Sequence, residues 1–269
     1  MFLTIETQVQ LGMKPQLHPY LFIIFFATIF EYNLHRLITI LSNPEALQGE
    51  KHKWVNTYRS AFYILVAASV IGFIIAACFA KKEVLFTLAP FGALTLFYSL
   101  PLFKNKSALV RLREIPFLKI FLISLVWSAT TILLPIIQTG INYDDTHIIL
   151  MLAERFLFVF AITIPFDIRD MLSDKRSGLK TFPLLVGEKK ALLFANIALL
   201  FFLTLCLYHY SDINLRFLLP AFIISALTTF IFINTKKVQT LYYYHYGVLD
   251  GTMLLQGVLV LLSYFVTTR

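Results

Sequence analysis

Eight long apolar runs constrain the fold of this chain more than any other feature of its sequence. They fall at about residues 20–41, 57–80, 84–102, 116–138, 147–166, 190–209, 215–233 and 246–266. A helix needs about 20 consecutive apolar residues to cross a bilayer, whereas a membrane-spanning strand needs only about ten that alternate. The runs are therefore predicted to form eight transmembrane helices of an all-α polytopic membrane protein.

The composition supports this class and a single domain. Of the 269 residues, 58% are apolar and only 14% are charged, and the mean hydropathy is +0.76. A soluble domain of this size has no interior large enough for so much apolar surface. Because no internal repeat or long linker divides the chain, residues 1–269 are predicted to form one transmembrane domain in contact with membrane lipids.

The net charge of +8 follows the pattern of a membrane topology. With eight spans, 17 of the 23 lysines and arginines fall on one side of the membrane. The positive-inside rule makes that side cytoplasmic, so the segment after the fifth run faces the cytoplasm and both chain ends lie opposite. The expected location is an inner bacterial membrane, and no nucleic-acid partner is expected.

The cysteines and the N-terminus add little to this assignment. Cys78 and Cys206 lie inside apolar runs, where free packing thiols are favoured over a disulfide. The first 20 residues lack the basic start and the continuous apolar core of a signal peptide. Residues 1–13 are also too short and too polar to span a bilayer.

Three carboxylates after the fifth run are the strongest candidate for a functional site. Asp167, Asp170 and Asp174 stand at i, i+3 and i+7, so they fall within about 60° of one helix face. Oxygen ligands without histidine or cysteine suit a hard cation such as Mg²⁺, which binds one or two carboxylates and keeps positions open for phosphate.

Basic residues follow these carboxylates at once. Lys175, Arg176 and Lys180 would suit a diphosphate that a metal ion bridges on the acidic side and that ion pairs hold on the other. The alternative is a solvated, charge-rich cytoplasmic loop. Within the same run, Pro165 predicts a kink or break just before the aspartates, and Glu154 and Arg155 are expected at the membrane interface.

The spacing of this segment resembles the second aspartate-rich motif of the UbiA-type intramembrane prenyltransferase superfamily. The matching residues are Asp167, Arg169, Asp170, Asp174, Gly178, Lys180, Thr181 and Pro183. The resemblance implies a UbiA-like bundle in which nine helices are usual. The second motif would then close the sixth helix, so residues 1–13 are interpreted as the remnant of a first helix that precedes eight full ones.

The first aspartate-rich motif of that superfamily is degenerate here. Only Asn33 remains of it, and leucines stand at the positions of the expected carboxylates: Leu34, Leu37 and Leu41. Arg36 could hold a phosphate bidentately where a metal ion would otherwise bridge it. Asn33, His35 and Arg36 would thus either line a substrate cleft or form a structural polar cluster between helices.

Further candidates lie at the same side of the membrane. The segment from Tyr98 to Lys104 resembles a basic element of the superfamily, and Lys119 opens the next run. Lys104 and Lys119 are candidates to bind diphosphate, although each could simply anchor a helix at the interface. Tyr98 and Asp250 are candidates for the substrate cleft, with helix pairing as the alternative for Asp250.

The resemblance implies transfer of a prenyl group from an isoprenoid diphosphate to a lipid-soluble acceptor in the bilayer. It assigns Mg²⁺ to Asp170 and Asp174 with help from Asp167, and the departing diphosphate to Arg36, Lys104, Lys119 and the basic residues after the aspartates. The alternative is a non-catalytic relative that binds a prenyl lipid or acts as a scaffold. The acceptor, the prenyl chain length and the oligomeric state do not follow from the sequence.

Overall fold

The computed structural model of the chain describes residues 1–42, 55, 57–100, 103–105, 108–110, 112, 115, 117–140, 142–176, 180–211 and 214–268. The side chains of a few of these residues are outside the description, among them His35, Ser99, Lys104 and Tyr246.

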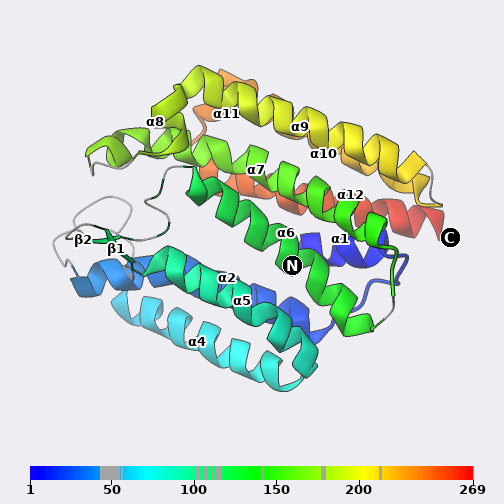
Figure 1. The fold of residues 1–269 in the computed structure, drawn as a ribbon, viewed down its shortest axis with the longest axis horizontal. Coiled ribbons are helices and arrows are strands. Elements are labelled where there is room, and N and C mark those ends of the chain that lie inside the picture. Colours follow the sequence, from blue (N-terminus) through cyan, green and yellow to red (C-terminus); the bar gives the residue numbers. More distant parts are fainter. Residues whose placement is uncertain are drawn as a thin grey trace.

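The described part is almost wholly helical (Figure 1). Its longer helices are α1 (Phe2–Gln10), α2 (Pro19–Ser42), α4 (Arg59–Cys78), α5 (Lys82–Ser99), α6 (Leu118–Thr139), α7 (Asp145–Arg176), α9 (Glu188–Ser211), α10 (Leu219–Asn234) and α12 (Asp250–Thr267). Short helices are α8 (Phe182–Val186), η4 (Arg216–Leu218), α11 (Lys236–Gln239) and the π-helix η5 (Tyr244–Leu249). Strands β1 (Phe103–Asn105) and β2 (Ala108–Val110) form an antiparallel hairpin.

Each predicted span corresponds to one of the long helices. In the described part of the chain, seven helices are long and apolar enough to cross a membrane. Helix α5, which contains the run predicted at 84–102, is not among the seven. It has 18 residues, so any 18-residue segment of it includes the charged Lys82 and Glu83 as well as Pro90, which lowers its hydropathy.

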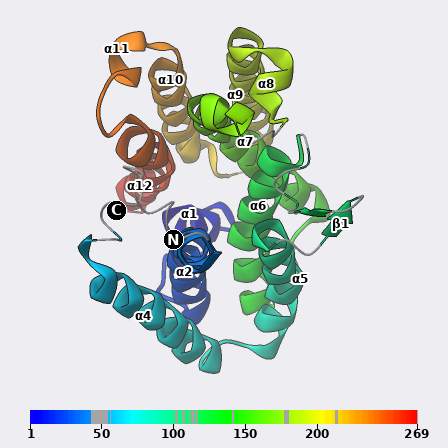
Figure 2. The same ribbon diagram turned by 90° about the vertical axis from the view of Figure 1, so that its left-hand side faces the viewer.

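Helix α1 lies inside the bundle. Viewed along the helices, it lies beside α2, between α12 and α6 (Figure 2). Seven of its nine residues are buried, among them the polar Thr4, Glu6, Thr7, Gln8 and Gln10. The predicted remnant of a first helix is thus helical, and it is buried between the neighbouring helices.

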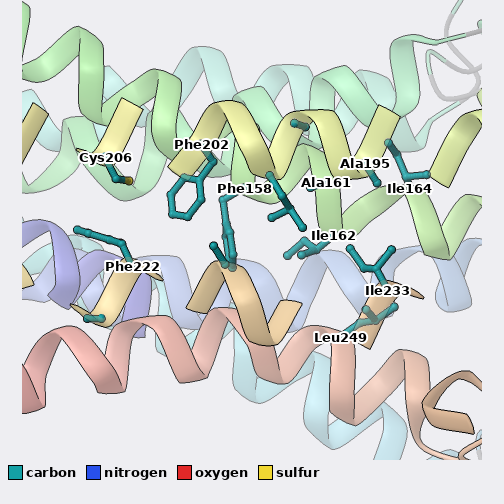
Figure 3. Packing of buried hydrophobic residues seen from close by; sticks show 14 of the residues in the cluster. Phe158, Ala161, Ile162, Ile164, Ala195, Phe202, Cys206, Phe222, Ile233 and Leu249 are labelled. Carbon is teal, nitrogen blue, oxygen red and sulfur yellow. The ribbon is translucent and has the colours of Figure 1, made fainter. Parts of the chain in front are cut away.

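Two of the three apolar clusters in the described part of the chain lie on either side of α1. The larger one joins α7, α9, α10 and α12, and Val9 of α1 belongs to it. Figure 3 shows its centre, where the ring of Phe158 lies 5.2 Å from that of Phe202, and Phe202 lies 6.1 Å from Phe222. The second cluster joins α2, α4, α5 and α6, and Ile5 of α1 packs against it. Helix α1 therefore connects the two halves of the molecule.

Helix α7 carries the predicted site without interruption. It runs for 32 residues through Pro165, so of the kink or break predicted before the aspartates, the break is not present. Proline removes one hydrogen bond, but its neighbours Ile164 and Asp167 are buried against other helices, and tertiary packing outweighs that loss. The aspartates are therefore helical and share one face, as their spacing predicts.

Candidate functional site

The aspartates lie at the end of α7 that Figure 1 shows near α8 and the hairpin. Asp167 is the deepest and is only 2% exposed, whereas Asp170 and Asp174 are half-buried. The other two carboxylates lie within electrostatic range of Asp167. This arrangement concentrates negative charge on one helix face and needs compensating cations nearby.

Lys119 supplies the first of these cations. It stands in the first turn of α6, and its Nζ lies 2.5 Å from Asp167 Oδ1. Asp174 and Tyr98 are also within electrostatic range of the ammonium group. The sequence-predicted Lys119, Tyr98 and aspartates are therefore brought together from α5, α6 and α7.

Arg169 supplies the second cation. Its Nε and Nη2 donate to Asp170 Oδ1 and Oδ2, both at 2.9 Å, which is the bidentate geometry of a strong ion pair. The guanidinium also lies over the ring of Phe166, 5.4 Å from its centre. Arg169 therefore holds one of the three carboxylates in a fixed orientation.

Residues from two further helices reach the same region. Asp250, the first residue of α12, is half-buried and lies within electrostatic range of Arg169. Tyr32 of α2 lies within range of both Asp250 and Tyr98. Tyr32 was not predicted from the sequence, and nothing there distinguishes it from the other tyrosines. The site thus draws on α2, α5, α6, α7 and α12.

The remnant of the first aspartate motif contributes few contacts to the site among the described residues. Asn33 is buried, and its Nδ2 donates to the carbonyl oxygen of Ile29 in its own helix at 2.7 Å. The Asn33 Oδ1 atom is buried without a hydrogen bond to the described residues. Arg36 is half-buried and takes part in none of the ion pairs between described residues. The side chain of His35 lies outside the description.

The remaining predicted cations lie at the edge of the site. Lys175 and Arg176 are exposed in the last turn of α7, and Lys180 is exposed just before α8. Gly178 lies outside the described residues, and Lys104 is placed only by its backbone in β1. Exposed cations at a helix end are free to contact a ligand that arrives from solvent, and they are equally consistent with simple solvation.

The carboxylates fit a metal ion that arrives with phosphate better than one held by protein alone. In the described part of the chain, no group of three or more His, Cys, Asp and Glu side chains is arranged to hold an ion. However, the buried Asp167 Oδ2 atom has no hydrogen-bond partner among the described residues, and the other two carboxylates lie nearby. Mg²⁺ typically takes one or two carboxylates together with substrate phosphates, so this donor set suits it.

Two residues expected at the interface are instead deep in the protein. Glu154 and Arg155 are each 2% exposed, about 18 Å along α7 from the aspartates. Arg155 donates to Glu6 of α1 at 2.7 Å, and Glu154 bonds to His209 of α9 at 2.7 Å. The prediction was wrong because the partners of this pair lie on helices far away in the sequence.

These observations define an integral membrane protein of the helical-bundle class, with an acidic, cation-lined site at one end. A model of the UbiA prenyltransferase family matches residues 56–243, and the chain therefore belongs to this family. The match includes the second aspartate motif and begins after the degenerate first one. No curated protein sequence matches the chain.

Solved structures of a UbiA homolog from Archaeoglobus fulgidus share the fold. One structure aligns with a TM-score of 0.68 and 15% identity, covering 100% of this chain and 94% of the other. The homolog bound to GPP and Mg²⁺ aligns with a TM-score of 0.67, 14% identity and 100% and 96% coverage. The form bound to DMAPP and Mg²⁺ aligns with a TM-score of 0.65 and 14% identity, covering 99% of this chain and 94% of the other. The sequence-predicted UbiA-like bundle is thus confirmed.

Proposed function

We propose that this protein binds an isoprenoid diphosphate at the cytoplasmic end of α7 and transfers its prenyl group to an acceptor dissolved in the bilayer. The observation that carries the proposal is the meeting of Lys119 with the carboxylates of α7, beside a buried Asp167 oxygen that has no partner among the described residues. Prenyl transfer is the activity of the family, and the related Archaeoglobus protein binds GPP or DMAPP with Mg²⁺.

Different residues of the site would neutralise different parts of the diphosphate charge. Asp167, Asp170 and Asp174 would hold Mg²⁺, which supplies positive charge to a leaving diphosphate. Lys119 stands beside these carboxylates and would move from Asp167 to a phosphate oxygen once the ion is bound. The exposed Lys175, Arg176 and Lys180 would contact the outer phosphate, as Arg36 and Lys104 would from α2 and the hairpin. Stabilising the departing charge lowers the barrier to breaking the carbon–oxygen bond.

The acceptor side is assigned to Asp250, Tyr32 and Tyr98. Tyr32 of α2 lies within electrostatic range of Asp250 of α12 and of Tyr98 of α5, and Asp250 lies within range of Arg169. A half-buried carboxylate is suited to accept the proton that an acceptor loses when its new bond to the prenyl carbon forms. His35 and Asn33 would complete this wall of the cleft from α2.

Binding of a radiolabelled allylic diphosphate to the purified full chain tests the donor site. We expect Mg²⁺-dependent binding that falls at least about tenfold in an Asp170→Ala/Asp174→Ala variant, because each charge-assisted contact contributes about 1.5–3 kcal/mol. The matched control is Asp144→Ala/Asp145→Ala, which removes two exposed carboxylates from the other end of the same helix. Absence of binding by folded protein at any Mg²⁺ concentration contradicts the proposal.

A second candidate is a non-catalytic protein that binds the prenyl diphosphate or a prenyl lipid. The leucines at the positions of the first-motif carboxylates favour it, since they leave only one acidic cluster. The two candidates differ in one measurement. A transferase moves the label from the diphosphate into a lipid-soluble product when membrane lipids are added, whereas a binding protein returns the diphosphate intact.

A further inference from the structure

A chain of ionisable side chains that the proposed function does not use lies at the opposite end of the bundle. His147 and Glu154 stand two turns apart on α7, and His209 of α9 lies between them. His147 Nδ1 is 2.6 Å from His209 Nε2, and His209 Nδ1 is 2.7 Å from Glu154 Oε1. Because His147 is half-buried while the other two are buried, the chain leads from the surface to the interior.

The partners of His147 determine where the protons lie. Its Nε2 is 3.1 Å from the carbonyl oxygen of Gln10, which can only accept, so Nε2 carries a hydrogen. In the neutral ring Nδ1 is then an acceptor, and His209 Nε2 must donate to it. One proton remains between His209 Nδ1 and Glu154 Oε1. Each hydrogen bond in the series from Gln10 through His147 and His209 to Glu154 therefore already contains its one hydrogen.

The described groups at the interior end of this series are all buried, so a proton from solvent reaches His147 first. Tyr210 donates its hydroxyl to Glu154 Oε2 at 3.2 Å, and the Cys206 thiol lies near the same carboxylate. Arg155 is paired with Glu6 at 2.7 Å, so these two charges balance each other. Helices α6, α10 and α12 contribute uncharged side chains here, namely Thr131, Ser225 and Gln256.

An added proton therefore enters at His147. Protonation of Nδ1 makes both ring nitrogens donors, and two N–H groups would then face each other across the 2.6 Å between His147 and His209. The His147 ring must turn away. Asp144 lies beside it, accepts its backbone N–H at 3.2 Å and attracts the charged ring.

Turning His147 away removes a contact that holds α1. Gln10 is the last residue of α1, and three contacts hold it to α7 and α9. Its carbonyl accepts from His147, its Oε1 accepts from Arg155 at 3.0 Å, and its Nε2 donates to the Tyr210 hydroxyl at 2.6 Å. The first of these is lost when the ring leaves.

We propose that His147, His209 and Glu154 form a proton-binding site, and that a proton bound at His147 loosens the C-terminal end of α1 from α7 and α9. The ligand of the site is a proton from the side of the membrane opposite the aspartate motif. The proposal does not depend on the identity of any substrate. It assigns a role to the buried cluster that joins α1 to the rest of the bundle.

Hydrogen–deuterium exchange of the full chain in lipid nanodiscs tests the proposal. At about pH 7.5 and about pH 5, which bracket histidine titration, exchange rates are corrected for their intrinsic pH dependence. We expect protection of residues 2–10 to fall by up to about tenfold at the lower pH, as the loss of one hydrogen bond between neutral groups predicts, while the middle of α9 stays protected. The His147→Gln variant keeps a donor for Gln10 but cannot take a proton. In this variant the protection of residues 2–10 should therefore not depend on pH.

Two further variants make the outcome decisive. His245→Gln, which changes a histidine of η5 at the other end of the bundle, should respond to pH as the wild type does. Asp144→Asn retains an acceptor for the His147 backbone but loses the charge, so the transition should move to lower pH. A wild type with equal protection at both pH values, a pH response that survives in His147→Gln, or an unmoved transition in Asp144→Asn overturns the proposal.

Discussion

Replacing Arg155 by methionine should destabilise the protein more than any surface substitution of the same kind. The guanidinium donates to Leu3 O at 2.7 Å, Thr131 Oγ1 at 3.3 Å, Glu6 Oε1 at 2.7 Å, Thr7 Oγ1 at 3.4 Å and Gln10 Oε1 at 3.0 Å. Four of these five partners belong to α1. Methionine fills similar space and donates nothing, so the change removes the main polar attachment of that helix.

The expected loss comes from two contributions. Hydrogen bonds inside membrane proteins are worth about 0.6 kcal/mol each on average, so five of them amount to about 3 kcal/mol. Glu6 is fully buried, and without Arg155 its carboxylate keeps, among the described residues, only the 3.0 Å hydrogen bond from Gln256. Breaking a buried ion pair in this way costs about 3–5 kcal/mol, so we expect a loss toward the upper end of that range.

Unfolding of the purified protein in mixed detergent micelles measures this loss. Burial raises the pKa of the Glu6 carboxyl, and Arg155 opposes that rise, so the stranded charge is the costly part. Adding Glu6→Gln to Arg155→Met should therefore recover at least about 1–2 kcal/mol. Arg176→Met, on the exposed end of α7, is the matched control and should change the free energy of unfolding by less than about 0.5 kcal/mol. An Arg155→Met loss as small as that of the control would refute this account of how α1 is held.

Two other substitutions probe the site and the packing of α1. The Lys119→Met variant should bind Mg²⁺ about tenfold more tightly in the absence of diphosphate, because Asp167 loses the ammonium group that lies 2.5 Å from it. Titration calorimetry measures this affinity, and an unchanged value would contradict the role of Lys119. Gly257→Ala should lower the free energy of unfolding by about 1–3 kcal/mol, because the added Cβ would lie 2.8 Å from Phe2 Cβ and 2.9 Å from the Phe2 backbone. Gly251→Ala is the control and should change it little, because its Cβ would have no atom within 4 Å.

The membrane helices and the acidic face were predictable because both depend on local rules. Run length determines which segments span a bilayer, and the 100° turn per residue places Asp167, Asp170 and Asp174 on one face wherever they are helical. A kink or break at Pro165 was predicted by an equally local rule, but packing on both sides of the proline keeps the helix unbroken. Lys119 was expected near the phosphate, but its pairing with Asp167 depends on how α6 packs against α7.

The cluster around Arg155 could not be predicted in this way. Its partner Glu6 is 149 residues distant, and no periodicity or motif connects the two positions. On composition alone a nine-residue helix with five polar residues looks like an exposed segment. It is buried only because side chains of α7, α9 and α12 satisfy its polar groups, and that information resides in the tertiary arrangement.

The position of α1 also sets the order in which the molecule can be assembled. Glu6 bonds to Gln256 across 250 residues, so α1 has this partner only when α12 has been made. Until then the polar groups of α1 lack part of the hydrogen-bond partners that they have in the folded protein. Contacts of such long range slow folding. The attachment of α1 to the bundle is thus completed only after α12, 250 residues further along the chain, is available.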